Sequence, residues 1–164
     1  MDADYFRLLY DYNRWANARI LDRAQEVSEA DYFAPFPGLS FGNLHGTLVH
    51  LVGAEMNWHR RWTGQGGAVF SATEYPDLAS LLALRTEAEA RQAEFLASLT
   101  DDAVNRDNTY TMPNGSALTH KLGHQLGHWV NHAQQFRAEA AVRLTSLDLS
   151  PGGIDLVGWL NTQG

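Results

Sequence analysis

The sequence predicts a single all-α domain, a four-helix bundle that covers residues 1–164. Three observations support this prediction. Four long segments repeat apolar residues at steps of three and four, the spacing of a helix with one buried face. Segments rich in glycine, proline and asparagine separate them. The 164 residues, 45% of them hydrophobic, are enough to fill one sizeable core.

The first long helix is expected from Tyr5 to about Glu26, because aromatic and aliphatic residues recur there on one face. Ser28 is followed by Asp31 three residues later, which resembles a capping box. This pair predicts one further helical turn, which the prolines and glycine at 35–38 should end.

The second and third long helices are expected to be joined by an extended connection. Ser40 offers a cap for the second helix, which should end near Gly64. The segment from Gly64 to Pro76 is long enough to carry the chain along the bundle instead of simply reversing it. Asp77 suits the cap of the third helix, whose apolar stripe extends to Leu99.

The fourth long helix is expected after a connector at Thr100–Gly115, which ends in a Pro-Asn-Gly turn signal at 113–115. Ser116 is the predicted cap, and the apolar pattern continues to Leu144. Ser150-Pro151 then suits the start of a short closing helix.

The composition excludes several classes of protein. The chain has no cysteine, so it has no disulfide, no thiolate metal ligand and no cysteine nucleophile. A net charge of −7 and a single lysine, Lys121, argue against a surface that binds nucleic acid. No stretch reaches the roughly 18 apolar residues of a membrane span, and no leader pattern opens the chain, so we expect a cytoplasmic protein without a membrane partner.

Four histidines follow one another at four-residue steps in the predicted last helix: His120, His124, His128 and His132. Residues four apart lie on one helix face with Cβ atoms about 5–6 Å apart, so neighbouring imidazoles could converge on one ion. The row drifts around the helix axis, so at most two adjacent members can share a metal. His128 and His132 are favoured because they lie deeper among apolar residues than His120 does.

A further ligand has to come from another helix, because a catalytic zinc-type site usually has three protein ligands and one open position. His50 is the natural donor, since it lies within the apolar segment LVHLVGAE of the second helix. The residues leave open whether His50 is a ligand or a hydrogen-bonded core histidine. His45 and His59 have no comparable partners, and we expect them at the surface or at a cap.

Three segments resemble the DinB/YfiT-like family: LLYDYNRWANARIL, LHGTLVHLVGAEMNWHRRW and GHWVNHAQQFRAEAAVRLTSLDLSPGGIDL. They span nearly the whole chain in the family's order. The resemblance implies a bundle with up-down-down-up topology, a homodimer, and a divalent metal ion, zinc or nickel, bound by three histidines. It also implies a small-molecule substrate, because related bundles include transferases that use low-molecular-weight thiols.

Carried over to this chain, the family's ligands fall on His50, on His132 and on the position of Phe136, which precedes Arg137. Phenylalanine cannot bind a metal, and His128, one turn back, is the remaining substitute. The predicted metal ligands are therefore His50, His128 and His132.

Two hypotheses for the function follow. The first is a metal-assisted, thiol-dependent transferase or hydrolase, with Glu55 or Glu139 supporting the ligands. The second is a non-catalytic, dimeric, stress-related binding module that lost its metal, as Phe136 suggests. A carrier of haem or of an apolar ligand is a third reading.

Overall fold

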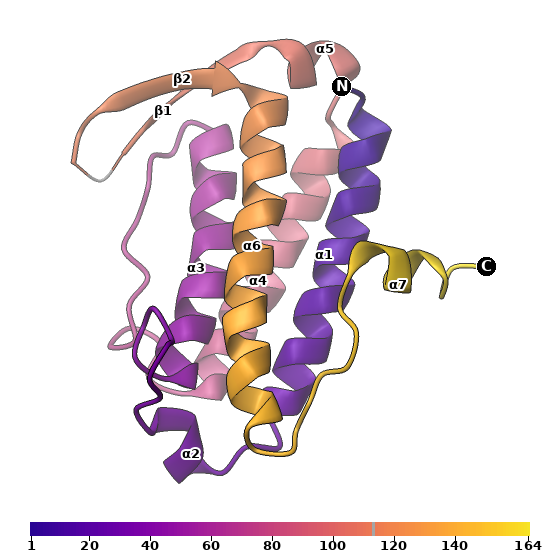
Figure 1. Cartoon of the computed structure of the whole chain (residues 1–164). Coiled ribbons are helices and arrows are strands. Elements are labelled where there is room, and N and C mark those ends of the chain that lie inside the picture. The colour runs from indigo at the N-terminus through magenta and orange to yellow at the C-terminus, as the bar shows by residue number, and fades with distance from the viewer. Residues whose placement is uncertain (113) are drawn as a thin grey trace.

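The computed structural model describes residues 1–112 and 114–164, and it forms a bundle of four long helices (Figure 1). The long helices are α1 (Ala3–Ala24), α3 (Leu44–Trp62), α4 (Leu78–Ala97) and α6 (Leu122–Thr145). Shorter elements complete the described chain: α2 (Glu29–Phe33), α5 (Asp101–Asn105), β1 (Asp107–Thr111), β2 (Ala117–Lys121) and α7 (Leu156–Leu160). None of the described helices is long and apolar enough to span a membrane.

The long helices follow the up-down-down-up order (Figure 1). α1 and α6 run in one direction, and α3 and α4 run in the other. α3 packs against α4 and α6, and α1 packs against the same two helices. Residues 63–77 carry the chain back along the bundle between the parallel helices α3 and α4, as the length of this segment predicts.

Capping side chains explain where the helices begin. Ser28 caps α2 and Asp77 caps α4, both as predicted. α3 begins later than predicted, because Asn43 caps it in place of Ser40. The Ser40 hydroxyl instead donates a hydrogen bond of 2.7 Å to Glu139 of α6, which fastens the loop before α3 to that helix.

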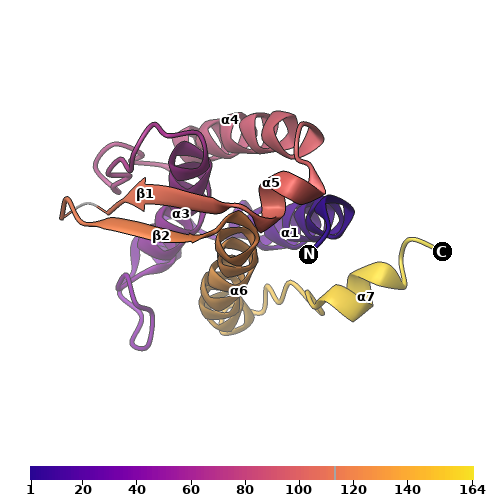
Figure 2. The same ribbon diagram turned by 90° about the horizontal axis from the view of Figure 1, so that it is seen from above.

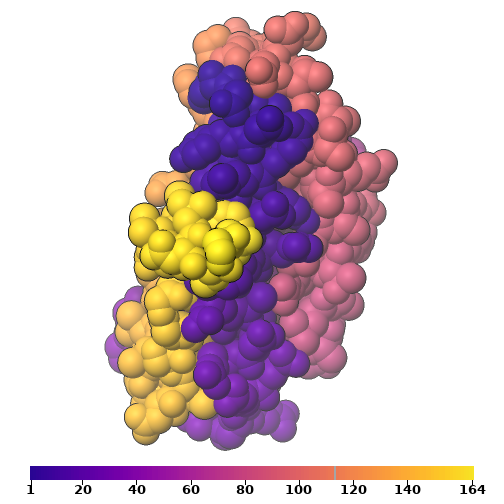
Figure 3. Space-filling model, turned by 90° about the vertical axis from the view of Figure 1, so that its right-hand side faces the viewer, coloured from indigo at the N-terminus to yellow at the C-terminus, as the bar shows by residue number. Residues whose placement is uncertain are grey.

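The closing helix α7 lies against α1 (Figure 3). It begins after Asp155 and not at Ser150-Pro151, because the Asp155 carboxylate accepts a hydrogen bond of 2.8 Å from the backbone N–H of Gly158. Trp159 is buried, and its ring packs against Tyr12 of α1 with the centroids 6.1 Å apart.

The segment between α4 and α6 differs most from the prediction. Part of the expected connector Thr100–Gly115 forms α5 and β1, and residues after the expected cap Ser116 form β2. The two strands pair as an antiparallel hairpin that projects beyond the helices (Figures 1 and 2). β-Branched and aromatic residues favour strands, and the hydroxyls of Thr109 and Thr119 form a cross-strand hydrogen bond of 2.8 Å. The predicted turn includes Pro113, which lies outside the described residues.

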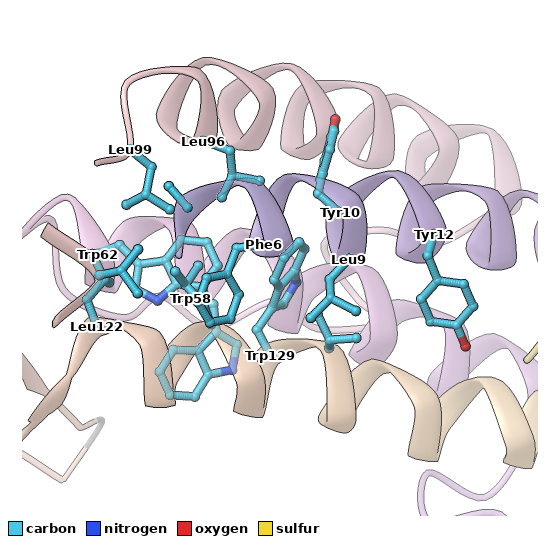
Figure 4. Close-up of a cluster of buried hydrophobic side chains, with 14 of the residues drawn as sticks. Phe6, Leu9, Tyr10, Tyr12, Trp58, Trp62, Leu96, Leu99, Leu122 and Trp129 are labelled. Carbon is cyan, nitrogen blue, oxygen red and sulfur yellow. The ribbon is translucent and has the colours of Figure 1, made fainter. Parts of the chain in front are cut away.

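Two clusters of buried apolar side chains fill the bundle. The cluster near the hairpin is rich in aromatic rings from three long helices, among them Phe6, Trp58, Trp62 and Trp129 (Figure 4). The other cluster is mostly aliphatic and includes Leu44, Leu48, Leu81 and Leu144. Together the two clusters extend along the length of the bundle, as the high apolar content predicts.

A layer of buried polar side chains lies between these clusters and joins α1, α3 and α6. Glu55 Oε1 accepts hydrogen bonds from the side-chain amides of Asn13, at 2.6 Å, and Asn17, at 2.7 Å. Arg137 Nη1 donates to the carbonyl oxygens of both amides. Burial raises the pKa of Glu55, whereas the two asparagines and the positive charge of Arg137 lower it. In this layer the two asparagines therefore bridge the buried carboxyl group of Glu55 and the buried guanidinium group of Arg137 through hydrogen bonds.

Candidate functional site

A cavity of about 590 Å³ lies between α3, α6 and the hairpin. Pockets of about 300–1,000 Å³ are typical of small-molecule sites. From α3, the residues His50, Trp58 and Arg61 line it at helical spacing. The hairpin contributes Tyr110 and Leu118, which oppose each other across the strands and so lie on the same face. The hairpin that the sequence did not reveal therefore forms one wall of the cavity.

At the wall of this cavity, His50 of α3 and His132 of α6 come together. Their Nε2 atoms are 3.3 Å apart. Two metal–nitrogen bonds of about 2.0–2.1 Å at a tetrahedral angle span about 3.3–3.4 Å, so this separation suits two ligands of one ion. It also suits a hydrogen bond in which one neutral imidazole donates to the other.

Both imidazoles of the pair are held in the neutral form. Burial lowers the pKa of His50, and the charge of Glu139 opposes this effect. Burial, and to a lesser extent the nearby basic side chains of His50, His128 and Arg61, lower the pKa of His132 to about 4. Neutral imidazole is the form that binds a metal ion or accepts a proton. The pair is therefore ready for either role at neutral pH.

Aromatic rings enclose the pair where a third ligand is expected. The ring centroid of Phe136 lies 4.3 Å from that of His50 and 4.7 Å from that of His132. Phe41 stacks on His50 at 4.1 Å. Within residues 1–112 and 114–164, no three His, Cys, Asp or Glu side chains gather closely enough to hold a metal ion. The residues present thus fit a two-nitrogen centre, and a third protein ligand is not in place.

The histidine row is interrupted, because His120 belongs to β2 and not to α6. Nevertheless His120, His124, His128 and His132 all line the same cavity as His50. His128 is exposed to this space, and its ring lies edge-on to Trp58 at 5.1 Å and 5.7 Å from the ring of His132. The structure therefore brings His50 and His132 together and leaves His128 on the same wall one turn away.

The prediction that His45 and His59 lie at the surface or at a cap was wrong. Both are buried, with exposed fractions of 3% and 6%. His45 Nδ1 lies 3.3 Å from the hydroxyl of Tyr32, and the ring of His59 packs edge-on against Phe95. α3 packs against α2 and α4, and His45 faces α2 whereas His59 faces α4. Neither histidine lines the cavity.

The two carboxylates expected to support the ligands lie in different places. Glu139 accepts hydrogen bonds from the backbone N–H and the hydroxyl of Ser40, at 2.8 and 2.7 Å, and its charge acts on His50. Glu55 belongs to the polar layer of the core. Of the two, only Glu139 is therefore placed to influence the histidine pair.

Sequence reasoning missed Arg61 as a cavity residue, although a signal was present. Ala54, Trp58 and Arg61 follow His50 at spacings of four, four and three, so they share one face of α3. The helical spacing from His50 therefore already predicts that Arg61 lies on the same face of α3.

The metal-free protein is expected to lose stability as the pH falls from about 6.5 to about 4. The pKa of His132 is about 4 in the folded protein and 6.5 in the unfolded reference, so in this range the unfolded state binds more protons. The free energy of unfolding therefore decreases with falling pH, by up to about 3 kcal/mol from this group. Urea titrations with EDTA at pH 7, 5.5 and 4.5 should show a shallower decrease for His132→Gln than for the parent.

The control for this pH experiment is His124→Gln, because His124 is exposed on the same helix. It should follow the pH profile of the parent. Parallel profiles for all three proteins would contradict the assignment of the acid sensitivity to His132.

Comparison with known proteins agrees with this architecture. The DinB family model matches residues 1–163. Among solved structures, the fold is similar to YfiT from Bacillus subtilis, described as a probable metal-dependent hydrolase with an unusual four-helix bundle topology. The TM-score is 0.66 at 15% sequence identity, and the alignment covers 87% of each chain. No curated protein matches the chain. Because the family model covers almost every residue, this chain belongs to the DinB family.

Proposed function

We propose that this protein is a metal-dependent enzyme that acts on a small molecule, as a hydrolase or a thiol-dependent transferase, with His50 and His132 as ligands of a divalent ion. The observation that carries the proposal is the 3.3 Å between their Nε2 atoms at the wall of a cavity of about 590 Å³. The description of YfiT as a probable metal-dependent hydrolase supports it.

The donor atoms suit zinc or nickel, since both ions bind neutral imidazole well. A bound ion would supply Lewis acidity, either to a substrate oxygen or to water or a thiol whose pKa it lowers. His128, one turn before His132 on the same wall, is the proposed third ligand, and its ring, now 5.7 Å from that of His132 between centroids, would have to turn towards the pair. Phe41 and Phe136 pack against one side of the pair and make it apolar. The chain has no cysteine, so a reacting thiol would come with the substrate.

The proposal predicts that His50→Ala and His132→Ala each weaken zinc binding at least about tenfold, because each removes one of two converging nitrogens. Titration calorimetry with zinc at pH 7.5 would measure this. His124→Gln is the matched control, since His124 lines the cavity but is exposed and not part of the pair. Equal losses in all three variants would indicate binding at the surface and contradict the proposal.

Two further measurements complete this experiment. His128→Ala tests whether His128 is the third ligand. If it is, this variant should lose as much zinc affinity as His50→Ala and His132→Ala do. Removing metal with EDTA should not unfold the protein, since apolar clusters fill the bundle along its length without help from an ion. Thermal unfolding curves measured with and without EDTA would show this. Buried His45 and His59 are unsuitable controls, because their replacement would disturb the core.

A second function is favoured by Phe136. Its buried ring lies against both histidines, at the position of the third family ligand, and makes that side of the pair apolar. A binding module without metal would keep the cavity and use the histidine pair as a neutral hydrogen-bonding group. The zinc titration separates the two functions, because the module predicts no binding in the parent protein. A stress-related role, a homodimer, a cytoplasmic location and the lack of a nucleic-acid partner stay predictions.

A further inference from the structure

Arg61 lies on the cavity wall and is held there by aromatic rings. Its guanidinium carbon is 4.7 Å from the ring centroid of Trp58 and 5.8 Å from that of Tyr110. Such cation–π contacts use the faces of the planar group and leave the N–H donors at its edge available. Arg61 is therefore positioned as a rigid donor at the cavity and not as a mobile surface charge.

The guanidinium of Arg61 has no acceptor in the part of the chain that the structure describes. No hydrogen bond or ion pair there involves its side chain, and its Nε is buried without a partner. The neighbouring Arg60, by contrast, donates to the backbone carbonyls of Gln65 and Gly66. Buried polar groups are normally hydrogen-bonded, so a partly buried cation without an acceptor is a place for an anionic ligand.

Although the protein as a whole is acidic, no acidic side chain of the described residues lines the cavity. The chain has 19 acidic residues and a net charge of −7. None of these carboxylates is among the described residues that line the cavity, where Arg61 and five histidines are the basic groups. An anion entering this cavity would therefore meet positive charge and hydrogen-bond donors, without repulsion from a lining carboxylate.

The remaining walls are largely apolar. They include Trp58, Phe70, Tyr110, Met112 and Leu118. Phe70 comes from the segment between α3 and α4, and it packs directly on Gly53 of α3. A Cβ atom on that glycine would lie 2.5 Å from the Cβ of Phe70, so glycine is what allows this wall to close. These walls suit the apolar body of an organic molecule.

We propose that the cavity binds an organic acid, with its carboxylate, sulfonate or phosphate group on Arg61 and its apolar body against the aromatic wall. Ring contacts run from Arg61 to Trp58, from Trp58 to His128 and from His128 to His132. A ligand anchored at Arg61 can thus extend along this wall towards the histidine pair. The inference names a substrate class for the proposed function and rests on that function for the reaction, whereas the binding itself needs no metal.

Two fluorescent probes with the same ring system test the proposal. 1-Anilinonaphthalene-8-sulfonate carries an acidic group, and N-phenyl-1-naphthylamine lacks it. In buffer with EDTA, the folded protein should bind one sulfonate probe, and more tightly than the neutral probe. Arg61→Met keeps the length of the side chain and removes its charge. This variant should lower the affinity for the sulfonate probe about tenfold and change the affinity for the neutral probe by less than about twofold.

Arg106→Met is the matched control, because it removes the same charge from an exposed side chain outside the cavity. It should leave both affinities unchanged. Equal effects of the two variants on the sulfonate probe would overturn the proposal, as would an unchanged affinity in Arg61→Met. If Arg61→Met fails to fold, competition on the parent protein decides: 2-naphthoate should displace the sulfonate probe at lower concentration than 2-naphthamide. Equal displacement would also overturn the proposal.

The experiment is independent of the metal proposal. In His132→Ala the protein should still bind the sulfonate probe more tightly than the neutral probe, because the group that distinguishes the two probes is Arg61. If the parent protein binds no zinc but still prefers the sulfonate probe through Arg61, the proposed enzyme is contradicted and the acid-binding cavity is supported. If the pair binds zinc but the affinity for the sulfonate probe does not depend on Arg61, the acid-binding cavity is contradicted and the proposed enzyme is supported.

Discussion

Replacing Arg137 with methionine is expected to lower the free energy of unfolding by about 3–5 kcal/mol, the usual cost of leaving a buried charged group without its partner. Arg137 is fully buried and donates to Asn13, Asn17 and Gln134. Its removal leaves the buried amide oxygens of Asn13 and Asn17 and the partly buried one of Gln134 with fewer donors, and it leaves Glu55 without a positive charge nearby. Urea unfolding followed by circular dichroism at pH 7 would measure the loss.

The control for this variant is Arg91→Met. Arg91 pairs with Glu87 one turn away on the exposed face of α4, and such pairs contribute about 0.3–0.5 kcal/mol. A double variant, Arg137→Met with Glu55→Gln, should recover part of the loss, because it removes the carboxyl group that Arg137 compensates. Equal losses for Arg137→Met and Arg91→Met would show that the polar layer does not act as a charge-compensated unit.

The helices could be predicted because their signals are local. Ser28 and Asp77 cap helices where the sequence places them, and the length of the 63–77 segment predicts the parallel packing of α3 and α4. The hairpin was missed because local signals conflict there. Ser116 offers a helix cap and His120 continues the four-residue spacing, yet strand-favouring residues and cross-strand pairing decide the outcome.

The burial of polar residues could not be read from the sequence in the same way. His45 and His59 are buried because α2 and α4 pack against α3, and the packing of neighbours is a tertiary property. Arg137 follows Phe136 in the chain, but nothing in the sequence pairs it with Asn13 or Asn17, which lie more than 100 residues away. Periodicity indicates which face of a helix is apolar, and it does not indicate which polar groups will find each other inside.

The candidate site was predictable in part. The resemblance to the family led to His50 and His132, and the structure places their Nε2 atoms 3.3 Å apart. His128 stays a prediction, because its ring lies on the same wall but 5.7 Å from that of His132 between centroids, outside the close pair. Arg61 and the hairpin residues complete the cavity from elements whose positions depend on tertiary packing.

The substitution Phe136→His is expected to raise the affinity for zinc at least about tenfold, or about 1.4 kcal/mol, by adding a third nitrogen to the pair. Residues 132 and 136 lie one turn apart on the same face of α6. The ring of Phe136 already lies 4.3 Å from that of His50 and 4.7 Å from that of His132, between centroids. An imidazole of similar orientation would bring a nitrogen close to the two Nε2 atoms. Titration calorimetry with zinc on parent and variant would measure the gain.

Thermal unfolding adds an independent measurement of this gain. Without metal, Phe136→His should be less stable than the parent, because a polar ring replaces a buried apolar one. Zinc should raise its melting temperature more than it raises that of the parent, since at equal concentration a more tightly bound ligand stabilises the folded state more. Gln135→His is the control, because it adds an imidazole to the exposed side of the same helix turn. A similar gain in the control would point to surface binding.

An unchanged affinity in Phe136→His would contradict the prediction, and His128→Ala in the parent then identifies the reason. If His128→Ala abolishes zinc binding, His128 already supplies the third nitrogen, and the pocket around Phe136 is not needed for the metal. If neither the parent nor Phe136→His binds zinc, the 3.3 Å contact between His50 and His132 is a hydrogen bond between neutral imidazoles. The buried ring of Phe136 then belongs to a metal-free binding module, and Arg61 becomes the group that decides what the cavity binds.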